Sequence, residues 1–322
     1  MTETVSACPL CGESASEPFD QRVFHGVRVS NQNCRACGLV FQSPRMAEAE
    51  LQEFYAAEYR RLYQGSEGPS ANDLAVQTQR ASALITFLQG AIPAPAAPTE
   101  DSICLDIGCS AGKLLEAYAR AFGCRVVGIE PGDAYRQEDQ RRGLDVYASL
   151  EGFEVSGLYP CHLISLIHVL EHLPHPVEYL VHLRQKLLHA DGGAGTDHQV
   201  TEQGWLLLEV PNLYCHDCFE VAHLTSFSAH TLVQTLDQAG FEIVAFKKHG
   251  APRSRWLPLY ITVLAKARRG VGADTRVSPM GADTRVSPYS ATGGRRAVIP
   301  ERGVWLKRRL GMLRKSVVTA VM

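Results

Sequence analysis

The sequence of 322 residues lacks the features that mark several large classes of protein. No apolar run approaches the roughly 18 residues that a membrane-spanning helix needs, and the longest, residues 256–265, has the length of a strand. Residues 1–10 contain neither a basic stretch nor an apolar core, so we expect no secretory signal and a cytoplasmic location. With 45% hydrophobic residues, the chain also differs from disordered proteins, in which apolar residues are scarcer.

A large excess of charge is missing as well. The formal net charge is −2, which argues against a protein whose main surface binds nucleic acid. Residues 295–322 are the exception, because they are rich in Lys and Arg and contain Glu301 as their only acid. The remainder of the chain is therefore acidic overall, and the C-terminal segment stands apart from it.

Cysteine, in contrast, is abundant. Ten cysteines in a chain without a secretory signal imply a reducing compartment. Two C-x-x-C pairs lie near the N-terminus, and Gly12 and Gly38 follow them directly, where positive φ would turn backbone amides toward the sulfurs. Four thiolates complete a tetrahedral zinc shell, a reading that the reducing compartment favours over two disulfides. We predict a structural zinc ion bound by Cys8, Cys11, Cys34 and Cys37.

The other cysteines call for different interpretations. Four of them lie in or beside apolar strands and are expected in the core. They are Cys104, Cys109, Cys124 and Cys161. Cys215 and Cys218 form a third C-x-x-C pair without a partner pair. We interpret it as a loop that contains two thiols, rather than as a redox couple or a second metal site with His216 or His223.

Composition divides the chain into six segments. They are a zinc-binding ribbon (1–45), a helical connector (46–92), a Pro/Ala linker (93–101), an α/β domain (102–268), a linker with two copies of GADTRVSP (269–300) and a basic amphipathic tail (301–322). In the connector, the aromatic-rich stretch 47–63 and residues 73–91 are expected to form helices. The Pro/Ala tract is the clearest predicted domain boundary.

Strands and helices alternate in the α/β domain. Apolar runs predict strands at 103–108, 124–130, 161–169, 205–210, 241–246 and 257–267, and helices at 112–122, 177–188 and 229–240. This alternation is typical of a parallel sheet that is covered by helices on both faces. The long connection 191–204 precedes a strand, so we expect it at the amino edge of the sheet, away from ligands.

A loop of small residues closes the first strand of this domain. Asp106–Gly112, with the sequence DIGCSAG, opens the first helix, so its backbone can approach a ligand closely. Glu130 ends the next strand, where a carboxylate can accept both hydroxyls of a ribose. The loop lacks the G-x-G-x-x-G pattern of nicotinamide-binding proteins, since Ser110 and Lys113 occupy the second and third glycine positions. The combination predicts an adenosine-containing cofactor other than NAD.

The DIGCSAG loop resembles motif I of class I S-adenosylmethionine-dependent methyltransferases. Gly128–Pro131 is similar to the acidic motif that follows it, and His168–Pro174 to the segment after strand four in small-molecule methyltransferases. The C-x-x-C pairs with GLVFQSPRMAEAELQEFY resemble a zinc-binding segment fused to some of these enzymes, including deoxysugar C-methyltransferases. The likeness covers residues 8–268. It implies a Rossmann-like sheet of about seven mostly parallel strands with a small N-terminal zinc-ribbon module.

The resemblance also implies S-adenosylmethionine as cofactor. The residues that match its binding segments are Asp106, Gly108, Cys109, Ser110, Gly112, Glu130, Pro131 and His168. The implied reaction is methyl transfer to carbon or oxygen of a small-molecule or glycan-type acceptor. Sugar nucleotides, polyketides, lipids and phenols all fit this class, as does a lipid-linked acceptor.

Transfer to carbon or oxygen also requires the acceptor to lose a proton, for which histidine is suited near neutral pH. His168, Glu171 and His172 follow the fourth strand, and His223 follows the fifth. Because these strand ends flank the switch point of the sheet, we expect the four side chains near the acceptor. We predict that His172 or His223 is the general base and that Glu171 either orders the cofactor pocket or holds His172.

Two other functions fit parts of the sequence. A binding or scaffolding protein without turnover would account for Cys161 and His162, which stand where the family usually has Asp. A nucleic-acid methyltransferase would grip RNA with its ribbon and basic tail. In residues 1–40, however, acids outnumber arginines, and no Asn/Asp-Pro-Pro-Tyr/Phe motif occurs in the chain. We therefore expect no nucleic-acid partner.

The basic tail has apolar residues at the spacing of one helix face. They are Leu306, Leu310, Leu313, Val317 and Val321. Such a helix can dock on its own domain, pair with a second subunit or contact an anionic membrane surface. Gly311 and the β-branched residues near the end weaken helix propensity, so we favour simple docking or disorder over membrane contact.

Overall fold

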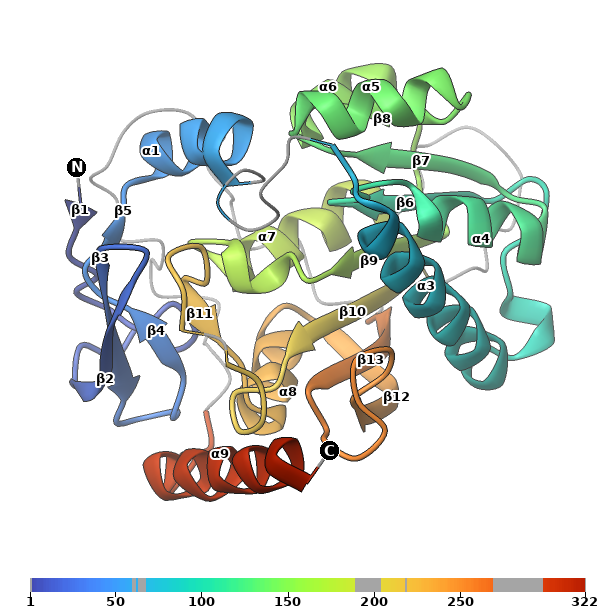
Figure 1. The fold of residues 1–322 in the computed structure, drawn as a ribbon. Coiled ribbons are helices and arrows are strands. Elements are labelled where there is room, and N and C mark those ends of the chain that lie inside the picture. The colour runs from blue at the N-terminus through green and yellow to red at the C-terminus, as the bar shows by residue number, and fades with distance from the viewer. Residues whose placement is uncertain are drawn as a thin grey trace, which may run out of the picture.

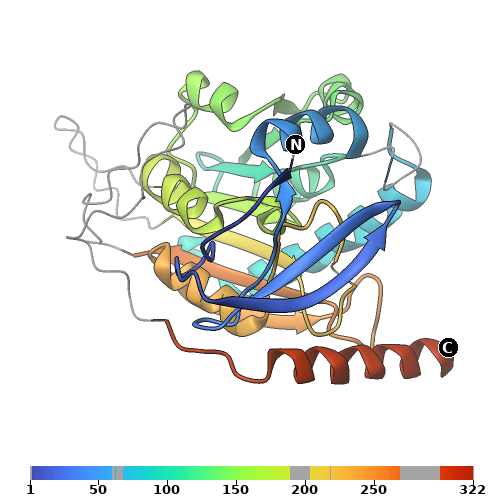
Figure 2. The same cartoon turned by 90° about the vertical axis from the view of Figure 1, so that its left-hand side faces the viewer.

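The computed structural model describes residues 2–59, 62, 68–188, 204–217, 219–268 and 298–321. Residues 191–203 of the predicted 191–204 insert, both GADTRVSP copies and Cys218 lie outside the described residues. Among the described helices, none is long and apolar enough to cross a bilayer. Figures 1 and 2 show the elements from two directions.

A seven-stranded sheet forms the centre of the molecule (Figure 1). Its strands follow the order β12 (Phe241–His249), β13 (Tyr260–Ala267), β10 (Trp205–Pro211), β9 (Leu163–Ile167), β6 (Ile103–Ile107), β7 (Arg125–Ile129) and β8 (Asp145–Tyr147). The pairs from β10 through β9, β6 and β7 to β8 are parallel, whereas β13 runs antiparallel to both of its neighbours. The predicted mostly parallel sheet is confirmed, and its order reverses direction between β6 and β9, where ligands bind in such folds.

Helices cover both faces of this sheet, so its central strands are apolar on both sides. Every residue of β10 is buried. Leu207 packs with α3 (Ala71–Ala91) and α4 (Lys113–Phe122), whereas Leu206 packs on the other face with the segment after β9 and α8 (Ala229–Gln238). The segment after β9 contains α7 (Pro176–His182), which continues as a π-helix over Leu183–Leu188.

Three elements at the β8 edge were not anticipated from the sequence. They are α5 (Asp133–Arg141), β8 itself and α6 (Leu150–Ser156). β8 has three residues, which is too short for a recognisable alternation, and α5 is so polar that it has no apolar stripe. Both helices pack beside β8 (Figure 1).

The predicted connector contains α1 (Glu48–Glu53), a π-helical turn over Phe54–Glu58, and α3. α3 packs along α4 and shares one apolar cluster with the sheet. The Pro/Ala tract after it lies against the sheet, because Ala96 O accepts a 3.1 Å hydrogen bond from Trp205 Nε1. The tract therefore connects α3 with β6 inside one core. The boundaries of the six predicted segments stay predictions.

The N-terminal segment forms a second sheet with part of the α/β domain. β2 (Ser16–Phe24), β3 (Val27–Cys34) and β4 (Val40–Gln42) are antiparallel, and β11 (Thr225–Ser226) adds a fourth strand beside β4. A short pair of β1 (Thr2–Glu3) with β5 (Arg45–Met46) completes the segment. In Figure 2 the β2–β3 hairpin crosses the front of the molecule above α9 (Val304–Val321).

α9 confirms the predicted C-terminal helix but docks through an unexpected face. Val304 and Arg308 are buried against the body, at 3% and 7% exposure. Leu306, Leu310 and Leu313 of the predicted apolar stripe are all exposed. The side chains of Val317 and Val321 lie outside the described residues. The helix therefore docks on its own domain, one of the alternatives favoured from the sequence, and these three leucines lie outside the contact.

Candidate functional site

The loop between β6 and α4 contains three residues with positive φ. Gly108, Ser110 and Gly112 have φ values of 75°, 53° and 63°, a region that favours glycine and is uncommon for serine. A Cβ on Gly108 would lie 2.6 Å from Val169 Cγ2, so no side chain fits there. The backbone at the start of α4 is therefore bare enough for a ligand to approach it.

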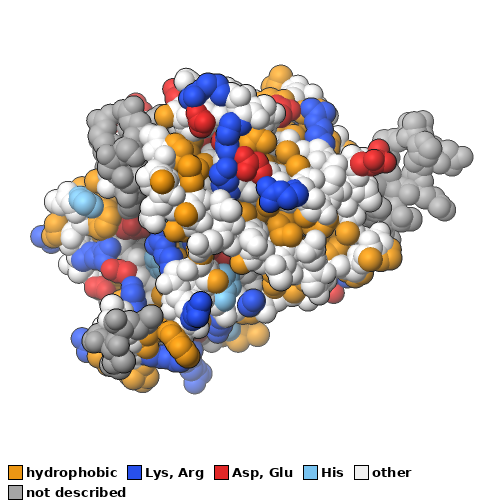
Figure 3. All heavy atoms as spheres, turned by 45° about the vertical axis from the view of Figure 1, so that its right-hand side comes forward, with side chains coloured by type: hydrophobic (Ala, Val, Ile, Leu, Met, Phe, Trp, Pro, Cys, Tyr) orange, Lys and Arg blue, Asp and Glu red, His pale blue; other side chains and the backbone are white. Residues whose placement is uncertain are grey.

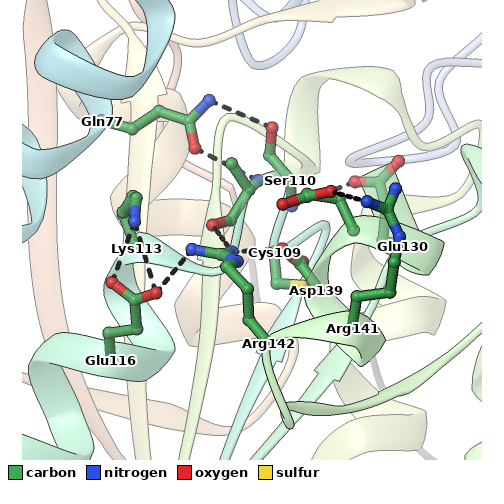
Figure 4. A network of polar contacts seen from close by, with 11 residues as sticks. Gln77, Cys109, Ser110, Lys113, Glu116, Glu130, Asp139, Arg141 and Arg142 are labelled. Atoms are coloured by element: carbon green, nitrogen blue, oxygen red, sulfur yellow. Dashed lines mark hydrogen bonds and ion pairs between the residues drawn. The ribbon is translucent and has the colours of Figure 1, made fainter. Parts of the chain in front are cut away.

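Glu130 lies beside this loop at the end of β7 and is 2% exposed. Its Oε2 accepts a 3.0 Å hydrogen bond from the Ser110 amide (Figure 4). Its Oε1 accepts a 2.9 Å bond from the Gly132 amide. These two backbone amides fix the carboxylate in place. Each carboxylate oxygen can accept more than one bond, so the pair retains capacity for ribose hydroxyls.

Gln77 reaches the same loop from α3, as Figure 4 shows. Its Oε1 accepts a 3.2 Å hydrogen bond from the Ala111 amide, and its Nε2 donates to Ser110 Oγ at 3.3 Å. Gln77 was not a candidate from the sequence. Gln77 lies on the same side of α3 as the buried residues Ala81 and Leu84, which face the sheet. A polar residue in line with these apolar ones was the feature of the sequence that could have identified it.

Buried acids lie beneath the loop. Asp106 Oδ1 accepts a 2.6 Å hydrogen bond from Ser165 Oγ, yet burial and the nearby Glu130 and Asp139 raise its pKa to about 7. Burial likewise raises the pKa of Asp139 to about 6, against the lowering effect of its 2.5 Å ion pair with Arg142. Asp106 and Asp139 would therefore interact favourably with a cationic ligand bound above them.

Cys109 and Gly112 support the loop from below. The Cys109 thiol lies 3.8 Å from Asp139 Oδ2 and packs with Leu115 and Val146. Burial raises the pKa of this thiol, which keeps it protonated. A Cβ on Gly112 would lie 2.4 Å from Leu144 Cδ1, so this glycine permits close packing rather than facing the cavity. If these two residues bind the cofactor, as predicted from the sequence, they do so through backbone atoms rather than through side chains.

A cavity of about 1220 Å³ lies at the carboxyl ends of the parallel strands. Of the residues predicted to bind the cofactor or catalyse, those that line it are Asp106, Gly108, Cys109, Ser110, Glu130, Pro131, His168, His172 and His223. Gly112 and Glu171 lie behind this surface. On the face in Figure 3, Lys and Arg side chains lie in both the upper and the lower part, and those in the lower part lie next to His side chains.

His172 and His223 meet edge to face, with ring centroids 4.8 Å apart. His172 Nδ1 lies 2.9 Å from both Ala222 O and the hydroxyl of Tyr55, so it carries the proton that the carbonyl accepts. Burial and the neighbouring His223 lower the pKa of His172 to about 4. His223 Nε2 lies 2.6 Å from Glu220 Oε1. His172 is therefore neutral near pH 7, whereas His223 has a carboxylate partner.

Glu171 lies beneath the two histidines and is 1% exposed. Neither of its carboxylate oxygens has a hydrogen-bond partner, and His168 Nδ1 is 3.4 Å from Oε1. Burial alone would raise its pKa, but His168, His172 and His223 lower it to about 2. Ligand atoms of Glu171, His172 and His223 lie within 4.8 Å of one another, so this group could also hold a metal ion.

A second network fixes His168, which has a positive φ of 58°. Its Nε2 lies 3.1 Å from the fully buried Glu209 of β10, which also contacts Arg80 of α3 at 3.1 Å. Thr262 Oγ1 donates to the same carboxylate at 2.9 Å. Despite burial, hydrogen bonds with His168 and His249 and the charge of Arg80 hold the pKa of Glu209 well below its usual range. Both ring nitrogens of His168 face acids, so the ring is positioned by them rather than available as a base.

Several of these residues were missed in the sequence. Tyr55 and Arg80 lie in segments that were assigned only as helices, and Glu209 and Glu220 were given no role. Arg80 is three positions after Gln77 and therefore shares its helix face, which was a readable signal. Tyr55 gave no such signal, because its contact with His172 joins residues 117 positions apart.

The four N-terminal cysteines converge as predicted. Cys8 Sγ lies 3.5 Å from Cys37 Sγ, Cys11 Sγ lies 3.5 Å from Cys34 Sγ, and all four sulfurs lie within 4.8 Å of one another. Tetrahedral zinc with four thiolates places sulfurs about 3.8 Å apart, so the set fits this metal. The four thiols form no disulfide.

The backbone around these cysteines also has the predicted form. Gly12 and Gly38 have φ values of 73° and 81°, as expected for the residue after each pair. The Leu39 amide points at Cys37 Sγ at 3.5 Å, which would stabilise a thiolate. The arrangement suggests a structural metal site with no open position for catalysis.

Comparison with known proteins defines the class of this fold. Residues 76–245, more than half of the chain, match the family model of a methyltransferase domain. Similar solved structures include 1,6-didemethyltoxoflavin-N1-methyltransferase from Burkholderia thailandensis with bound S-adenosylhomocysteine, at 17% identity over 78% of this chain and 99% of that one, TM-score 0.49. Magnesium protoporphyrin IX methyltransferase from Synechocystis, with bound SAM, is 15% identical in sequence. The match covers 68% of this chain and 95% of that one, with a TM-score of 0.44.

A methyltransferase from Leishmania major is similar at 17% identity over 67% of this chain and 80% of its own, with a TM-score of 0.45. A search of curated proteins gave no match. The chain belongs to the methyltransferase-domain family. The chain therefore contains a methyltransferase domain, the class of enzyme that its motifs implied.

Proposed function

We propose that this enzyme methylates a small-molecule or glycan-type acceptor, on carbon or oxygen, inside the 1220 Å³ cavity. The main support is that the cofactor loop after β6 and the His172–His223 pair after β9 and β10 line one cavity. Methyl transfer from a sulfonium is an in-line displacement that depends on positioning and on exclusion of water. A shared, partly buried cavity meets both needs.

The cofactor end of the cavity is assigned to the loop and Glu130. Glu130 would accept the ribose hydroxyls, and the buried acids would favour the positive charge of the sulfonium. His168, held by Glu171 and Glu209, would form a fixed wall. When bound, S-adenosylmethionine supplies the electrophilic methyl group. The full proposed set is Asp106, Gly108, Cys109, Ser110, Gly112, Glu130, Pro131 and His168.

Proton removal is assigned to His223, and His172 is its neutral neighbour. The Glu220 carboxylate, 2.6 Å from His223 Nε2, would stabilise the imidazolium that forms when the ring takes a proton. The Nδ1 proton of His172 is directed at Ala222 O. Its Nε2 atom can therefore accept a hydrogen bond from a hydroxyl group of the methyl-accepting substrate. The negative charge of Glu171, which lies below both rings, supports a protonated His223.

The test is production of S-adenosylhomocysteine with a panel of phenols, sugar nucleotides and lipid-linked sugars, followed by kinetics on the best acceptor. His223→Ala should abolish turnover and leave cofactor binding intact. Glu220→Gln removes the charge that stabilises imidazolium, so the pKa of His223 should fall and the acid limb of the kcat profile should move to lower pH. An unchanged profile in Glu220→Gln, or full activity in His223→Ala, would remove His223 from this role.

The same assays separate a base from a metal ligand. Added chelator should leave the rate unchanged if His223 acts as a base, whereas loss of activity that returns with a divalent cation would favour metal binding at Glu171, His172 and His223. We further propose one structural zinc ion bound by Cys8, Cys11, Cys34 and Cys37. It would hold the N-terminal strands against the domain that they join through β11.

A further inference from the structure

α9 is held to the body by the face opposite its apolar stripe. Arg308 donates to the carbonyl oxygens of Leu213 and His216, and its guanidinium lies 4.7 Å from the ring centre of Phe219. One turn later, a Cβ on Gly311 would lie 1.8 Å from Tyr214 O, so only glycine allows this close approach. These contacts fix which side of the helix faces outward.

The outward side of α9 is apolar. Leu306, Leu310 and Leu313 are 56%, 58% and 63% exposed, and on a helix with 3.6 residues per turn they lie on the side away from Val304 and Arg308. A row of leucines that faces solvent along a docked helix is unusual, since soluble proteins rarely expose contiguous apolar surface. Where they do, the exposed patch commonly marks a binding site. The contacts between α9 and the body therefore do not account for the leucines on the outward side of the helix.

Basic side chains flank this row. Lys307, Arg309 and Arg314 are exposed, and α9 contains no acidic residue. Arg309 lies 4.3 Å from the ring centre of Trp305, which is itself exposed. Leucine on one face, arginine at its borders and tryptophan at one end are typical of helices that lie in the plane of a bilayer surface. Anionic headgroups complement the flanking charges.

A neighbouring loop extends the same surface. Val318 of α9 packs against the cluster that contains Leu257 and Leu259 of the β12–β13 loop. Trp256 in that loop is 68% exposed. Figure 1 shows the loop beside the C-terminal end of α9. A second tryptophan thus lies next to the helix, at the end opposite Trp305.

We propose that the outward face of α9, together with Trp256, is a docking surface for an anionic lipid bilayer. The charges favour lipid over a second copy of the chain, because two α9 helices placed face to face would bring only cations together. The surface attaches the protein from one side and does not span the bilayer.

The docking surface adjoins the cavity. Lys315 of α9 and Arg253 of the β12–β13 loop both line it. An acceptor with an anionic headgroup, held at a lipid surface, would meet these two cations at the cavity. This consequence for the acceptor rests on the proposed function, whereas binding to the bilayer does not.

The test is co-sedimentation of the full-length protein with vesicles, either phosphatidylcholine alone or phosphatidylcholine with phosphatidylglycerol in equal parts. We expect binding to the mixed vesicles to be at least tenfold tighter and to weaken with added salt. The triple variant Leu306→Ser, Leu310→Ser, Leu313→Ser should lose at least tenfold in binding. The pair Arg309→Gln, Arg314→Gln should lose only the preference for anionic lipid.

A matched control is Val155→Ser, since Val155 is 90% exposed on α6, away from α9, and should bind like the wild type. Circular dichroism and S-adenosylhomocysteine binding establish that each variant is folded and keep this test separate from the methyl acceptor. Equal sedimentation of the triple variant and the wild type would overturn the proposal. So would a wild-type dimer in light scattering that the triple variant abolishes while neither protein binds vesicles.

Discussion

At the scale of single residues, Glu130 shows how much a sequence pattern can specify. A small-residue loop and an acid at the end of the next strand predicted a cofactor site, and the structure brings Glu130 to 3.0 Å from the Ser110 amide. Both belong to local strand–turn–helix units, whose geometry follows from nearby residues. Tyr55 and Arg80 could not be found in this way, because their partners lie far along the chain and depend on how α3 and the connector pack.

Substitution of Glu130 tests the cofactor end of the cavity. Glu130→Ala removes a carboxylate that would accept ribose hydroxyls, so S-adenosylhomocysteine should bind more weakly by about 1–3 kcal/mol, roughly a 5- to 150-fold change in Kd. Calorimetry measures it directly. Glu138→Gln is the matched control, because Glu138 lies on α5 in an exposed pair with Arg141 and should not affect affinity. Unchanged affinity in Glu130→Ala would contradict the assignment.

Asp106 provides a pH test. Its pKa of about 7 lies above its unfolded value, so between about pH 4 and 7 the folded state binds more protons than the unfolded state. The contribution of Asp106 is therefore favourable at low pH and is lost as pH rises through 7. Asp106→Asn cannot ionise and should unfold at a higher temperature than the wild type at pH 8, with a difference that shrinks toward pH 5. Thermal unfolding of the cofactor-free protein measures this, and a constant difference would contradict it.

At the scale of elements, periodicity predicted the long helices and buried strands but not the short or polar ones. α4, α8 and β10 carry strong apolar patterns, whereas three-residue β8 and polar α5 do not. The sequence also cannot show that β11 pairs with β4, since the two strands are separated by most of the chain. That pairing ties the cysteine-rich segment to the loop that carries His223.

Substitution of one proposed zinc ligand tests the N-terminal segment. Cys34→Ser should lose about one equivalent of bound zinc, as measured by mass spectrometry of the metal, because three thiolates hold the ion far more weakly. The α/β domain should remain folded and should still bind S-adenosylhomocysteine. Cys161→Ser, at a buried core cysteine outside the cluster, should retain the metal. Wild-type protein that is purified without zinc and contains two disulfides would refute the prediction.

At the scale of the whole molecule, α9 joins regions that the sequence presents as separate. Val304 packs with Val40 of the N-terminal sheet and with Leu213 and Phe219 after β10. Glu301 accepts hydrogen bonds from Tyr214 at 2.6 Å and Ser228 at 2.5 Å. The sequence predicted a helix but not its docked face, because a glycine and a buried arginine make a poor apolar pattern and the leucines dominate the periodicity.

Truncation after Arg268 removes α9 and should lower the thermal stability of the entire protein. Burial of Val304 contributes about 1.5–3 kcal/mol, and the hydrogen bonds of Arg308 and Glu301 add to it. Each kcal/mol corresponds to a shift in Tm of about 2–4 °C for a domain of this size. Because α9 contacts both sheets, calorimetry should show one transition at a lower temperature rather than a stable α/β core beside a loosened N-terminal segment. The variant Trp305→Ser is the control, since Trp305 is exposed on α9 and should leave the midpoint nearly unchanged. A truncated protein with the wild-type midpoint would mean that the contacts of α9 contribute no net stability.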